Sequence, residues 1–276
     1  MKHSFSQARG VSVLEMSVAL VLGTGLTLLM LQLYQTTVLN STQQWQQLQW
    51  QKDGLRLTTL LQQAVNNAGF IGCPHWGHRL PVLQLHPHWR VYANEALKIY
   101  QADGEQQWQP ALPIELQGKV APGTDVLQTV YGQGPLHHLL AKTQASTMIL
   151  TTPAALRTGD RVMVADCTRA VVAQIAQVGV DRIQLTRALP ESFSPPATVV
   201  RLQQQYFFIN RRGALAWQVF DQNAQAVMEA IAKLRIRPLI VGASNAMIGI
   251  DLTLWQTETS QPWQMQLGWF NHPMPG

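Results

Sequence analysis

The sequence predicts an α+β fold, in which a long N-terminal helix packs on an antiparallel β-sheet domain that carries a long irregular insertion. From Val11 to Phe70 apolar residues recur at three- and four-residue steps without a proline, which is typical of one continuous helix. Beyond Gly69 the apolar residues of short segments alternate every second position, as in strands with one buried face. The insertion is the segment 74–122, which is rich in Pro, His, Trp and Gln.

The first half of the predicted helix has the properties of a membrane anchor. The apolar run Val11–Leu33 is about the length that crosses a hydrocarbon core of roughly 30 Å, and Glu15 is its only charged residue. No small-x-small cleavage site follows the run, unlike an ordinary secretory signal. Lys2 and Arg9 precede it, so the positive-inside rule leaves the N-terminus in the cytoplasm and the rest of the chain outside.

The second half of the helix, residues 35–70, is more polar but keeps the helical pattern. Leu48, Leu57 and Leu61 belong to an apolar face that we expect to lie on the sheet. For Trp45 a position at the membrane edge and a position on the sheet both stay open. The helix is expected to end at Gly69, since glycine is the usual residue just past a helix. At 1.5 Å per residue it would be about 85 Å long.

The rest of the chain predicts an antiparallel sheet. Ten segments have strand character: Leu97–Tyr100, Asp125–Tyr131, Thr147–Thr151, Arg161–Ala165, Ala170–Val178, Arg182–Thr186, Val199–Ile209, Ala214–Phe220, Ile248–Gln256 and Gln264–Phe270. Gly179–Asp181 and Arg211–Gly213 separate neighbouring strands and predict hairpin loops. Ala224–Leu234 predicts a short helix, and Gly132-x-Gly134 before Pro135 predicts a turn.

Charge and composition argue against a nucleic-acid binder. The net charge is +5, and only 13% of residues are charged. No Lys/Arg cluster is present, although such a cluster is the usual mark of nucleic-acid binding. Without Lys2 and Arg9 the charge would be +3. We expect four segments: 1–10, a leader; 11–34, the transmembrane helix; 35–70, the helix beyond the membrane; and 71–276, a β-rich globular domain.

Cys73 and Cys167 are the two cysteines, and both lie in the part expected outside the cytoplasm. An even count in an oxidising compartment favours a disulfide. Such a bond would close a loop of roughly 95 residues and stabilise by about 4 kcal/mol in the loop-entropy model. Two separate buried thiols are the alternative.

Gly10, followed by Val11-Ser12-Val13-Leu14-Glu15, resembles the cleavage box of type IV prepilins. The resemblance implies that a prepilin peptidase cuts between Gly10 and Val11 and that the new amine of Val11 is N-methylated. The usual residue after the cut is Phe, where this chain has Val11. In that family the glutamate at the position of Glu15 pairs with the terminal amine of a neighbouring subunit. A charge in apolar surroundings needs such a partner.

Later segments resemble PilW-type minor pilins, the large β-rich subunits of type IV pili. The matching segments, in order, are Asn67–Cys73, Gly123–Leu127, Gly159–Cys167, Gln205–Asn210 and Ile240–Met247. By this resemblance Cys73 and Cys167 form the disulfide that joins the end of the helix to the sheet.

The resemblance implies an assembly role rather than catalysis. Such proteins sit in the inner membrane by a single span with the C-terminal domain in the periplasm, and they can enter the extracellular pilus. They assemble with other minor pilins, prime polymerisation of the major pilin, and form a tip complex that can display an adhesin. The pili serve twitching motility, adhesion or DNA uptake. No catalytic residue, cofactor, resident metal or direct nucleic-acid contact is expected.

Two other functions stay open at this point. The same cleavage box fits a minor pseudopilin of a type II secretion system. Alternatively, the chain is a membrane-anchored periplasmic metal-binding domain, because Cys73, His75 and His78 offer three ligands suited to zinc or copper. His86, His88, His137 and His138 would have to converge with them. Trp76, Trp89 and Trp108 of the insertion form either a contact patch or a small satellite core.

Overall fold

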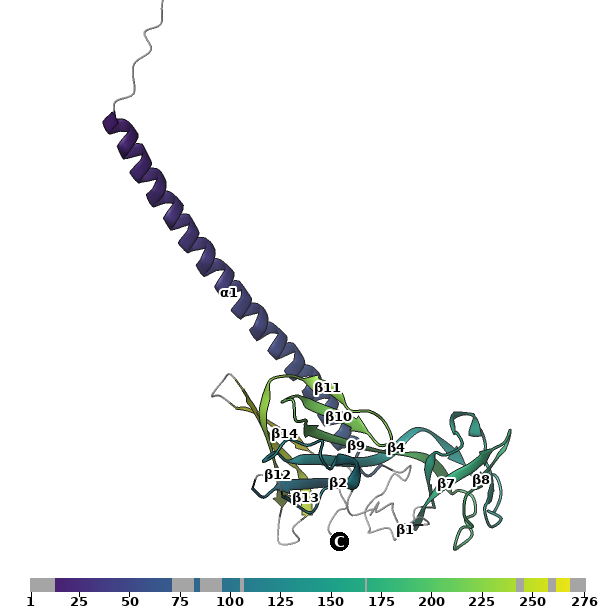
Figure 1. Cartoon of the computed structure of the whole chain (residues 1–276). Coiled ribbons are helices and arrows are strands. Elements are labelled where there is room, and N and C mark those ends of the chain that lie inside the picture. The colour runs from purple at the N-terminus through teal and green to yellow at the C-terminus, as the bar shows by residue number, and fades with distance from the viewer. Residues whose placement is uncertain are drawn as a thin grey trace, which may run out of the picture. The chain divides into compact units, whose positions relative to one another are not determined.

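The computed structural model describes residues 13–70, 82–84, 96–104, 107–166, 168–241, 246–257 and 262–268. The chain divides into two compact units, Met1–Gly54 and Leu55–Gly276. The described residues form one long α-helix and two β-sheets (Figure 1). The architecture is therefore α+β, as the sequence predicts.

The helix α1 runs without a break over Val13–Asn67, which confirms the prediction of a single helix. Within the first unit its segment Val13–Ser41 is long and apolar enough to cross a membrane, with a mean hydropathy of 1.9. None of its most apolar window is buried against the rest of the protein. The segment therefore differs from the core helix of a globular domain, whose apolar side chains are covered.

Hydroxyl side chains inside this segment bond to the backbone of their own helix. Thr24 Oγ1 donates to the carbonyl of Leu20 at 2.9 Å, and Thr27 Oγ1 donates to that of Gly23 at 2.7 Å. A hydroxyl without a partner in an apolar medium would lose several kcal/mol. These local bonds remove that cost, so Ser and Thr are compatible with a lipid-exposed position.

The second unit begins with the last turns of α1, whose apolar face is buried. Leu57, Leu61 and Val65 are no more than 1% exposed. Gly69 follows the helix with φ of 83°, a left-handed conformation that glycine adopts without steric cost. Its N–H donates to the carbonyl of Val130 at 2.8 Å. The end of the helix is thus fixed to a sheet strand, as predicted.

The larger sheet contains eleven strands among the described residues. They are β1 (Val82–Gln84), β2 (Leu97–Ala102), β3 (Trp108–Gln109), β4 (Val126–His138), β5 (Thr147–Ile149), β6 (Arg161–Ala165), β7 (Ala170–Val178), β8 (Arg182–Leu185), β9 (Thr198–Ile209), β10 (Leu215–Val219) and β11 (Gln225–Met228). The main order is β3-β2-β4-β9-β6-β7-β8-β5, with β10 beside β9, β11 beside β10, and β1 beside β7. Of the strand pairs that the structure describes, β1–β7 alone is parallel. The predicted hairpins at Gly179–Asp181 and Arg211–Gly213 join antiparallel neighbours and are confirmed.

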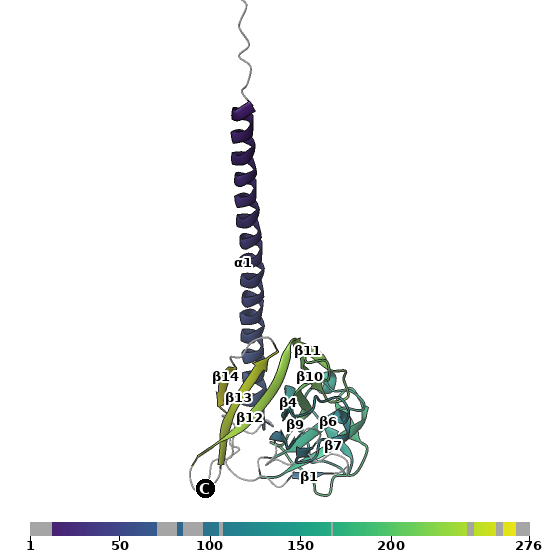
Figure 2. The ribbon, with the colours of Figure 1, turned by 60° about the vertical axis from the view of Figure 1, so that its left-hand side comes forward.

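A second sheet has the order β12-β13-β14, with β12 at Ile231–Val241, β13 at Ala246–Gln256 and β14 at Trp263–Gly268. It lies at the opposite end of the domain from β7 in both views (Figures 1 and 2). The helix predicted for Ala224–Leu234 is wrong, because this segment forms β11 and the start of β12. Its Ala, Met, Glu and Lys residues are good helix formers, but intrinsic propensity is a weak predictor that tertiary pairing overrides. Ala230, at φ of 59°, instead makes a turn, and pairing with β13 stabilises the strand.

The predicted turn at Gly132-x-Gly134 is also wrong, since both glycines lie inside β4. The strand register shifts between Gln133 and His137, and Gly134 has φ of 89°, so Gly134 lies in a β-bulge. Gly132 precedes the bulge and pairs regularly with Leu202. At Gly132 the backbone of β4 comes very close to the side chain of Val200 on β9. A Cβ there would lie 2.8 Å from both methyl carbons of Val200.

The predicted irregular segment 74–122 is more ordered than expected where the structure describes it. It contains β1, β2, β3 and the 3₁₀ turn η2 (Ile114–Leu116); a second 3₁₀ turn, η3, covers Pro153–Ala155. Leu116 and Val120 pack with Tyr206 and Phe208 in one buried cluster. A second cluster, around β5–β8, includes Met148, Leu185 and Phe193. The part of the sheet around β2, β4, β9 and β10 and the part around β5–β8 therefore each have an apolar core.

Candidate functional site

The residues predicted to be processed lie mostly outside the described residues. Gly10 and Val11 precede residue 13, and neither Cys73 nor Cys167 is described. The cleavage site, the methylation and the disulfide therefore stay predictions. Glu15 is described, and it lies in the first turn of α1. Acidic residues are favourable there because the helix dipole places partial positive charge at the N-terminus.

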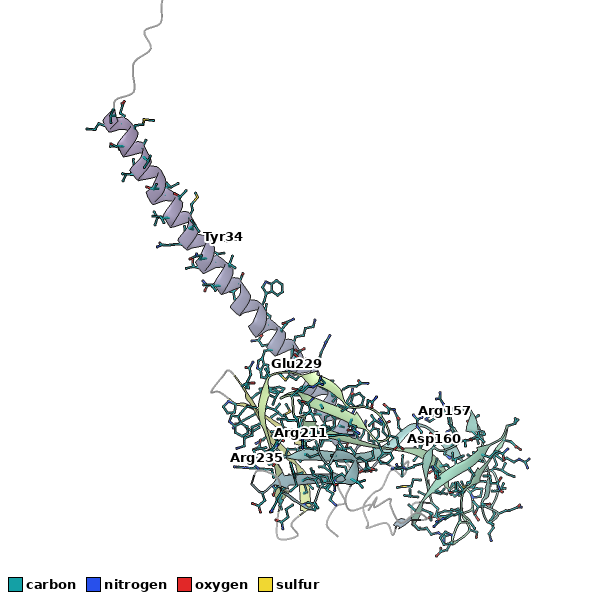
Figure 3. All side chains as sticks on the ribbon, viewed as in Figure 1. Tyr34, Arg157, Asp160, Arg211, Glu229 and Arg235 are labelled. Carbon is teal, nitrogen blue, oxygen red and sulfur yellow. The ribbon has the colours of Figure 1, made fainter. Side chains whose placement is uncertain are left out.

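The strongest candidate surface is an exposed apolar row on α1, which we name the helix stripe: Leu31, Tyr34, Val38, Trp45 and Leu48. The exposed fractions of these side chains range from 40% for Val38 to 69% for Tyr34 and Trp45. Figure 3 shows Tyr34 projecting from the helix. Leu31, Val38 and Trp45 recur every seven residues, Tyr34 follows Leu31 and Leu48 follows Trp45 by three residues, and the polar Ser41 stands three residues after Val38. This is the spacing of a coiled-coil seam.

The helix stripe corrects one sequence expectation. Leu48 was expected to lie on the sheet with Leu57 and Leu61, but it is 56% exposed. Trp45, for which the membrane edge was the alternative to the sheet, is 69% exposed. Leu48 precedes Leu57 by nine residues, which is about 180° around a helix of 3.6 residues per turn. The apolar pattern of residues 35–70 therefore contains two faces. The sequence signal for the second face is the seven-residue repeat that begins at Leu31.

A buried polar junction joins the two sheets. Asp125, which is 2% exposed, accepts hydrogen bonds from the backbone N–H groups of Ala102 at 2.9 Å and Ile236 at 2.8 Å. The guanidinium of Arg235 donates to the same carboxylate at 3.0 Å. Asp125 is the acidic residue of the segment Gly123–Leu127, and its hydrogen bonds connect β2, β4 and β12. Because both oxygens of the carboxylate accept hydrogen bonds within the domain, Asp125 has a structural role.

Asp166, in the segment Gly159–Cys167, also has a structural role. Its Oδ1 accepts from the backbone and hydroxyl of Thr168 at 3.1 and 2.6 Å, and its Oδ2 accepts from Arg169 Nε at 3.1 Å. Burial raises the pKa of the Asp166 carboxyl, but the hydrogen bonds from Thr168 and Arg169 outweigh it and bring the pKa below its usual value. Asp166 therefore caps the turn between β6 and β7 as a carboxylate.

The other candidate acids are engaged locally. Asp160 accepts from the backbone N–H of Arg157 at 2.8 Å (Figure 3), and Asp181 pairs with Arg182 at 2.9 Å. In the described part of the chain no three His, Cys, Asp or Glu side chains gather as a metal-binding group. The ligand set suggested by Cys73, His75 and His78 lies outside the described residues, as do His86 and His88.

His137 and His138 are neighbours in β4 but lie in different surroundings. His137 is 2% exposed, whereas His138 is exposed. Burial lowers the pKa of His137, and the nearby His138 lowers it further, against a backbone hydrogen bond at Thr152 that raises it. His137 is therefore a core residue that is held neutral.

The surroundings of Trp108 decide, for this residue, between a contact patch and a small satellite core. It is half-buried, packs against the cluster of Tyr100 and Val126, and donates from Nε1 to the carbonyl of Thr124 at 2.8 Å. It belongs to a satellite core rather than to a contact patch. Trp76 and Trp89 lie outside the described residues.

Comparison of the chain with protein-family models, curated proteins and solved structures found no significant match. The evidence on function therefore comes from the sequence and structure of this chain.

Proposed function

We propose that the chain is a pilin-like assembly subunit, namely a PilW-type minor pilin that takes part in initiating and assembling type IV pili. One observation carries the proposal: the exposed helix stripe continues past the end of the membrane-length segment. The prepilin-like box around Gly10 supports the same assignment.

Lipid can cover only part of the helix stripe. The apolar segment ends at Ser41, and Trp45 and Leu48 follow by four and seven residues, about 6 and 10 Å along the axis. Fully burying a large apolar side chain stabilises by about 1.5–3 kcal/mol. Clustered exposed apolar side chains mark interaction surfaces. The seven-residue repeat suits a second helix as the partner.

The N-terminal residues supply the second part of the proposal. A prepilin peptidase cuts between Gly10 and Val11, and the new amine of Val11 is methylated. Glu15, one helical turn from that amine, pairs with the amine of a neighbouring subunit inside the membrane. A carboxylate in a membrane segment costs about 2.5–3.5 kcal/mol at the helix centre on insertion scales and is usually retained for a function.

The remaining features follow from the same proposal. The chain is held in the inner membrane by one span, and the domain 71–276 lies in the periplasm with a Cys73–Cys167 disulfide. Its partners are other minor pilins, the major pilin and, at the fibre tip, an adhesin. The pili serve motility, adhesion or DNA uptake.

Site-directed photocrosslinking tests the helix stripe. A benzophenone amino acid at position 45 or 48 of the full chain in its native membrane should crosslink to another pilin-like subunit. The matched control is Val180 on the β7–β8 hairpin, which is 97% exposed and lies outside the stripe. Recovery of only lipid adducts from positions 45 and 48 would contradict the proposal.

Deletion of the chain distinguishes the pilus from the secretion machine. Loss of surface pili with intact protein export supports the minor pilin. Loss of export with intact pili would instead identify a minor pseudopilin of a type II secretion system, for which the helix stripe would serve equally well.

A further inference from the structure

Strand β9 has an interrupted edge in the middle of the large sheet. On one side β4 follows β9 along nearly its whole length. On the other side β6 pairs with Thr198–Arg201 and β10 pairs with Gln205–Ile209. Among the described strands, none pairs with Leu202, Gln203 or Gln204 on that side. The carbonyl of Gln204 accepts a hydrogen bond from the N–H of Phe220 at 2.8 Å, just past the end of β10. The sheet therefore has a notch three residues long between β6 and β10.

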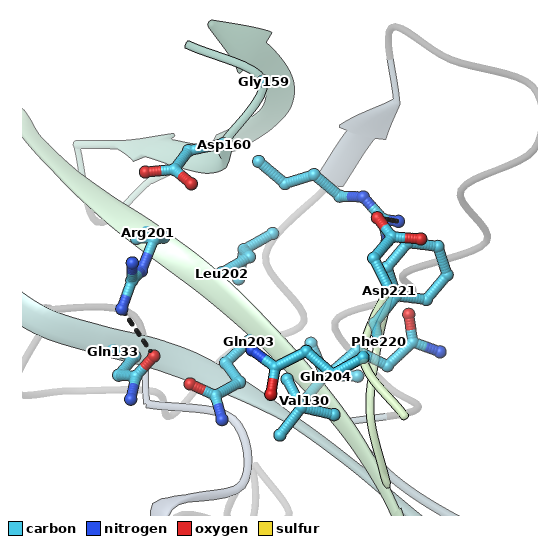
Figure 4. Close-up of a pocket in the computed structure, with 13 residues that line it drawn as sticks. Val130, Gln133, Gly159, Asp160, Arg201, Leu202, Gln203, Gln204, Phe220 and Asp221 are labelled. Carbon is cyan, nitrogen blue, oxygen red and sulfur yellow. Dashed lines mark hydrogen bonds and ion pairs between the residues drawn. The ribbon is translucent and has the colours of Figure 1, made fainter. Parts of the chain in front are cut away.

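A pocket of about 210 Å³ opens at this notch (Figure 4). Gln203 and Gln204 both line it, although consecutive residues of a strand point to opposite faces of a sheet. The same holds for Arg201 and Leu202. Side chains of both faces can meet in one pocket only because the neighbouring strand is missing there. The notch is thus the origin of the pocket.

Existing contacts hold several polar groups of the pocket in place. Arg161 stacks on the ring of Phe220, with its guanidinium carbon 3.3 Å from the ring centroid, and lies 3.6 Å from Asp221. Arg201 Nη2 donates to Gln133 Oε1 at 2.8 Å. Ordering these planar groups before a ligand arrives lowers the entropy cost of binding.

The chemistry of the lining favours a neutral ligand. Two guanidinium groups, Arg161 and Arg201, are balanced by the two carboxylates of Asp160 and Asp221. Four glutamines, among them Gln203, add amides that both donate and accept hydrogen bonds. The half-buried Gln203 amide has no hydrogen-bond partner in the described part of the protein. A ligand with many hydroxyl groups offers donors and acceptors to match.

We propose that this notch binds a single ring of a neutral sugar, such as a hexose at the end of a glycan. A pocket of about 210 Å³ is smaller than the roughly 300–1,000 Å³ of sites for drug-sized ligands, so it suits one ring. An added peptide strand needs a longer run of free edge groups than three residues provide, since the carbonyl of Gln204 is already bonded to Phe220. The ring's C–H surface can contact the half-buried Leu202 and Phe220 while its hydroxyls reach the amides and guanidinium groups.

Saturation-transfer NMR on the full chain in phosphatidylcholine nanodiscs tests the sugar site, since sugar-headed detergents would compete. The probes are methyl β-glucoside, methyl β-galactoside and N-acetylglucosamine at millimolar concentration. We expect transfer to the ring protons of at least one probe and binding about tenfold weaker in Arg201→Ala and Gln203→Ala. The matched control is Gln264→Ala on β14, an exposed glutamine outside the pocket, which should bind as the wild type does.

The thermal unfolding midpoint of each variant verifies folding, and Gln222→Ala at the exposed rim replaces any variant that fails. No transfer to any sugar, or unchanged binding in the pocket variants, would overturn the proposal. Glycylglycine or inorganic phosphate binding in place of the sugars would overturn it too. The result is independent of pilus assembly, because it is measured on the isolated chain.

Discussion

Arg235 and Asp125, 110 residues apart in the chain, form an ion pair of 3.0 Å that joins the three-stranded sheet to the large sheet. Arg235 Nη1 also donates to the carbonyl of Ala102 at 3.1 Å, and the N–H of Asp125 donates to that of Leu234 at 3.0 Å. The junction thus fixes how the two sheets of the domain meet.

Replacement of Asp125 should therefore destabilise the whole domain. Asp125→Ala removes the acceptor of the buried N–H groups of Ala102 and Ile236, whereas Arg235 keeps its bond to the carbonyl of Ala102. Each buried donor left unsatisfied costs about 1–3 kcal/mol, and loss of the ion pair adds less because the Arg235 side chain is 35% exposed. Urea unfolding of the full chain measures the loss. The control, Asp181→Ala, removes an exposed pair with Arg182 and should leave the unfolding midpoint unchanged. Equal midpoints for both variants would show that the junction is not important for stability.

Gly132 should tolerate no side chain unless Val200 is shortened. Gly132→Ala places its Cβ 2.8 Å from both Val200 methyls and 3.1 Å from the carbonyl oxygen of Phe70, and overpacking of this kind costs about 1–3 kcal/mol. The double variant Gly132→Ala/Val200→Ala relieves the methyl contacts. A double-mutant cycle by thermal unfolding should give a favourable coupling energy. Additive effects would contradict the close approach.

Acid should destabilise the domain through His137. Its pKa in the folded protein lies below the ordinary 6.5, so just below pH 6.5 the unfolded chain binds more protons than the folded one. The free energy of unfolding therefore falls as the pH drops below about 6.5 and levels off below the folded pKa. Unfolding curves from pH 8 to pH 5 should show this slope in the wild type and in His138→Gln, but a smaller slope in His137→Gln. The same slope in all three would exclude His137 as its source.

Glu15 should matter for assembly and not for insertion. Glu15→Val removes the only charge of the membrane segment, so recovery in the membrane fraction should be unchanged or higher. Loss of one ion pair between subunits should lower recovery in sheared filaments about tenfold, the effect of roughly 1.4 kcal/mol. Glu15→Asp, which keeps the charge, should retain more of it. Normal incorporation of Glu15→Val would remove the amine pairing from the mechanism.

The sequence predicts α1 and most strands correctly because their signals are local. The helical steps of Leu57, Leu61 and Val65 and the alternation in β6, β7 and β9 are visible in any short window. The prediction of a helix over Ala224–Leu234 failed because strand pairing outweighs the helix propensity of its residues. Its first part pairs with β10 and its last part with β13. The pair Gly132 and Gly134 misled because two nearby glycines also signal a turn. The register shift across Gly134 and the close approach of Val200 to Gly132 depend on β9, which is distant in the sequence.

The candidate sites depended on contacts that no window contains. Asp125 stands in a recognised motif, but its partner Arg235 lies on another sheet. The notch exists because β6 and β10 share one edge of β9, a matter of topology rather than of pattern. The helix stripe could have been predicted, since its seven-residue repeat is present in the sequence.

Mass spectrometry of the native N-terminus tests the pilin assignment most directly. The chain recovered from sheared filaments should begin with N-methylated Val11, and replacing Gly10 with a bulky residue should leave a longer, uncut form. Filament-bound chain that still begins at Met1 and carries its leader would contradict the assignment.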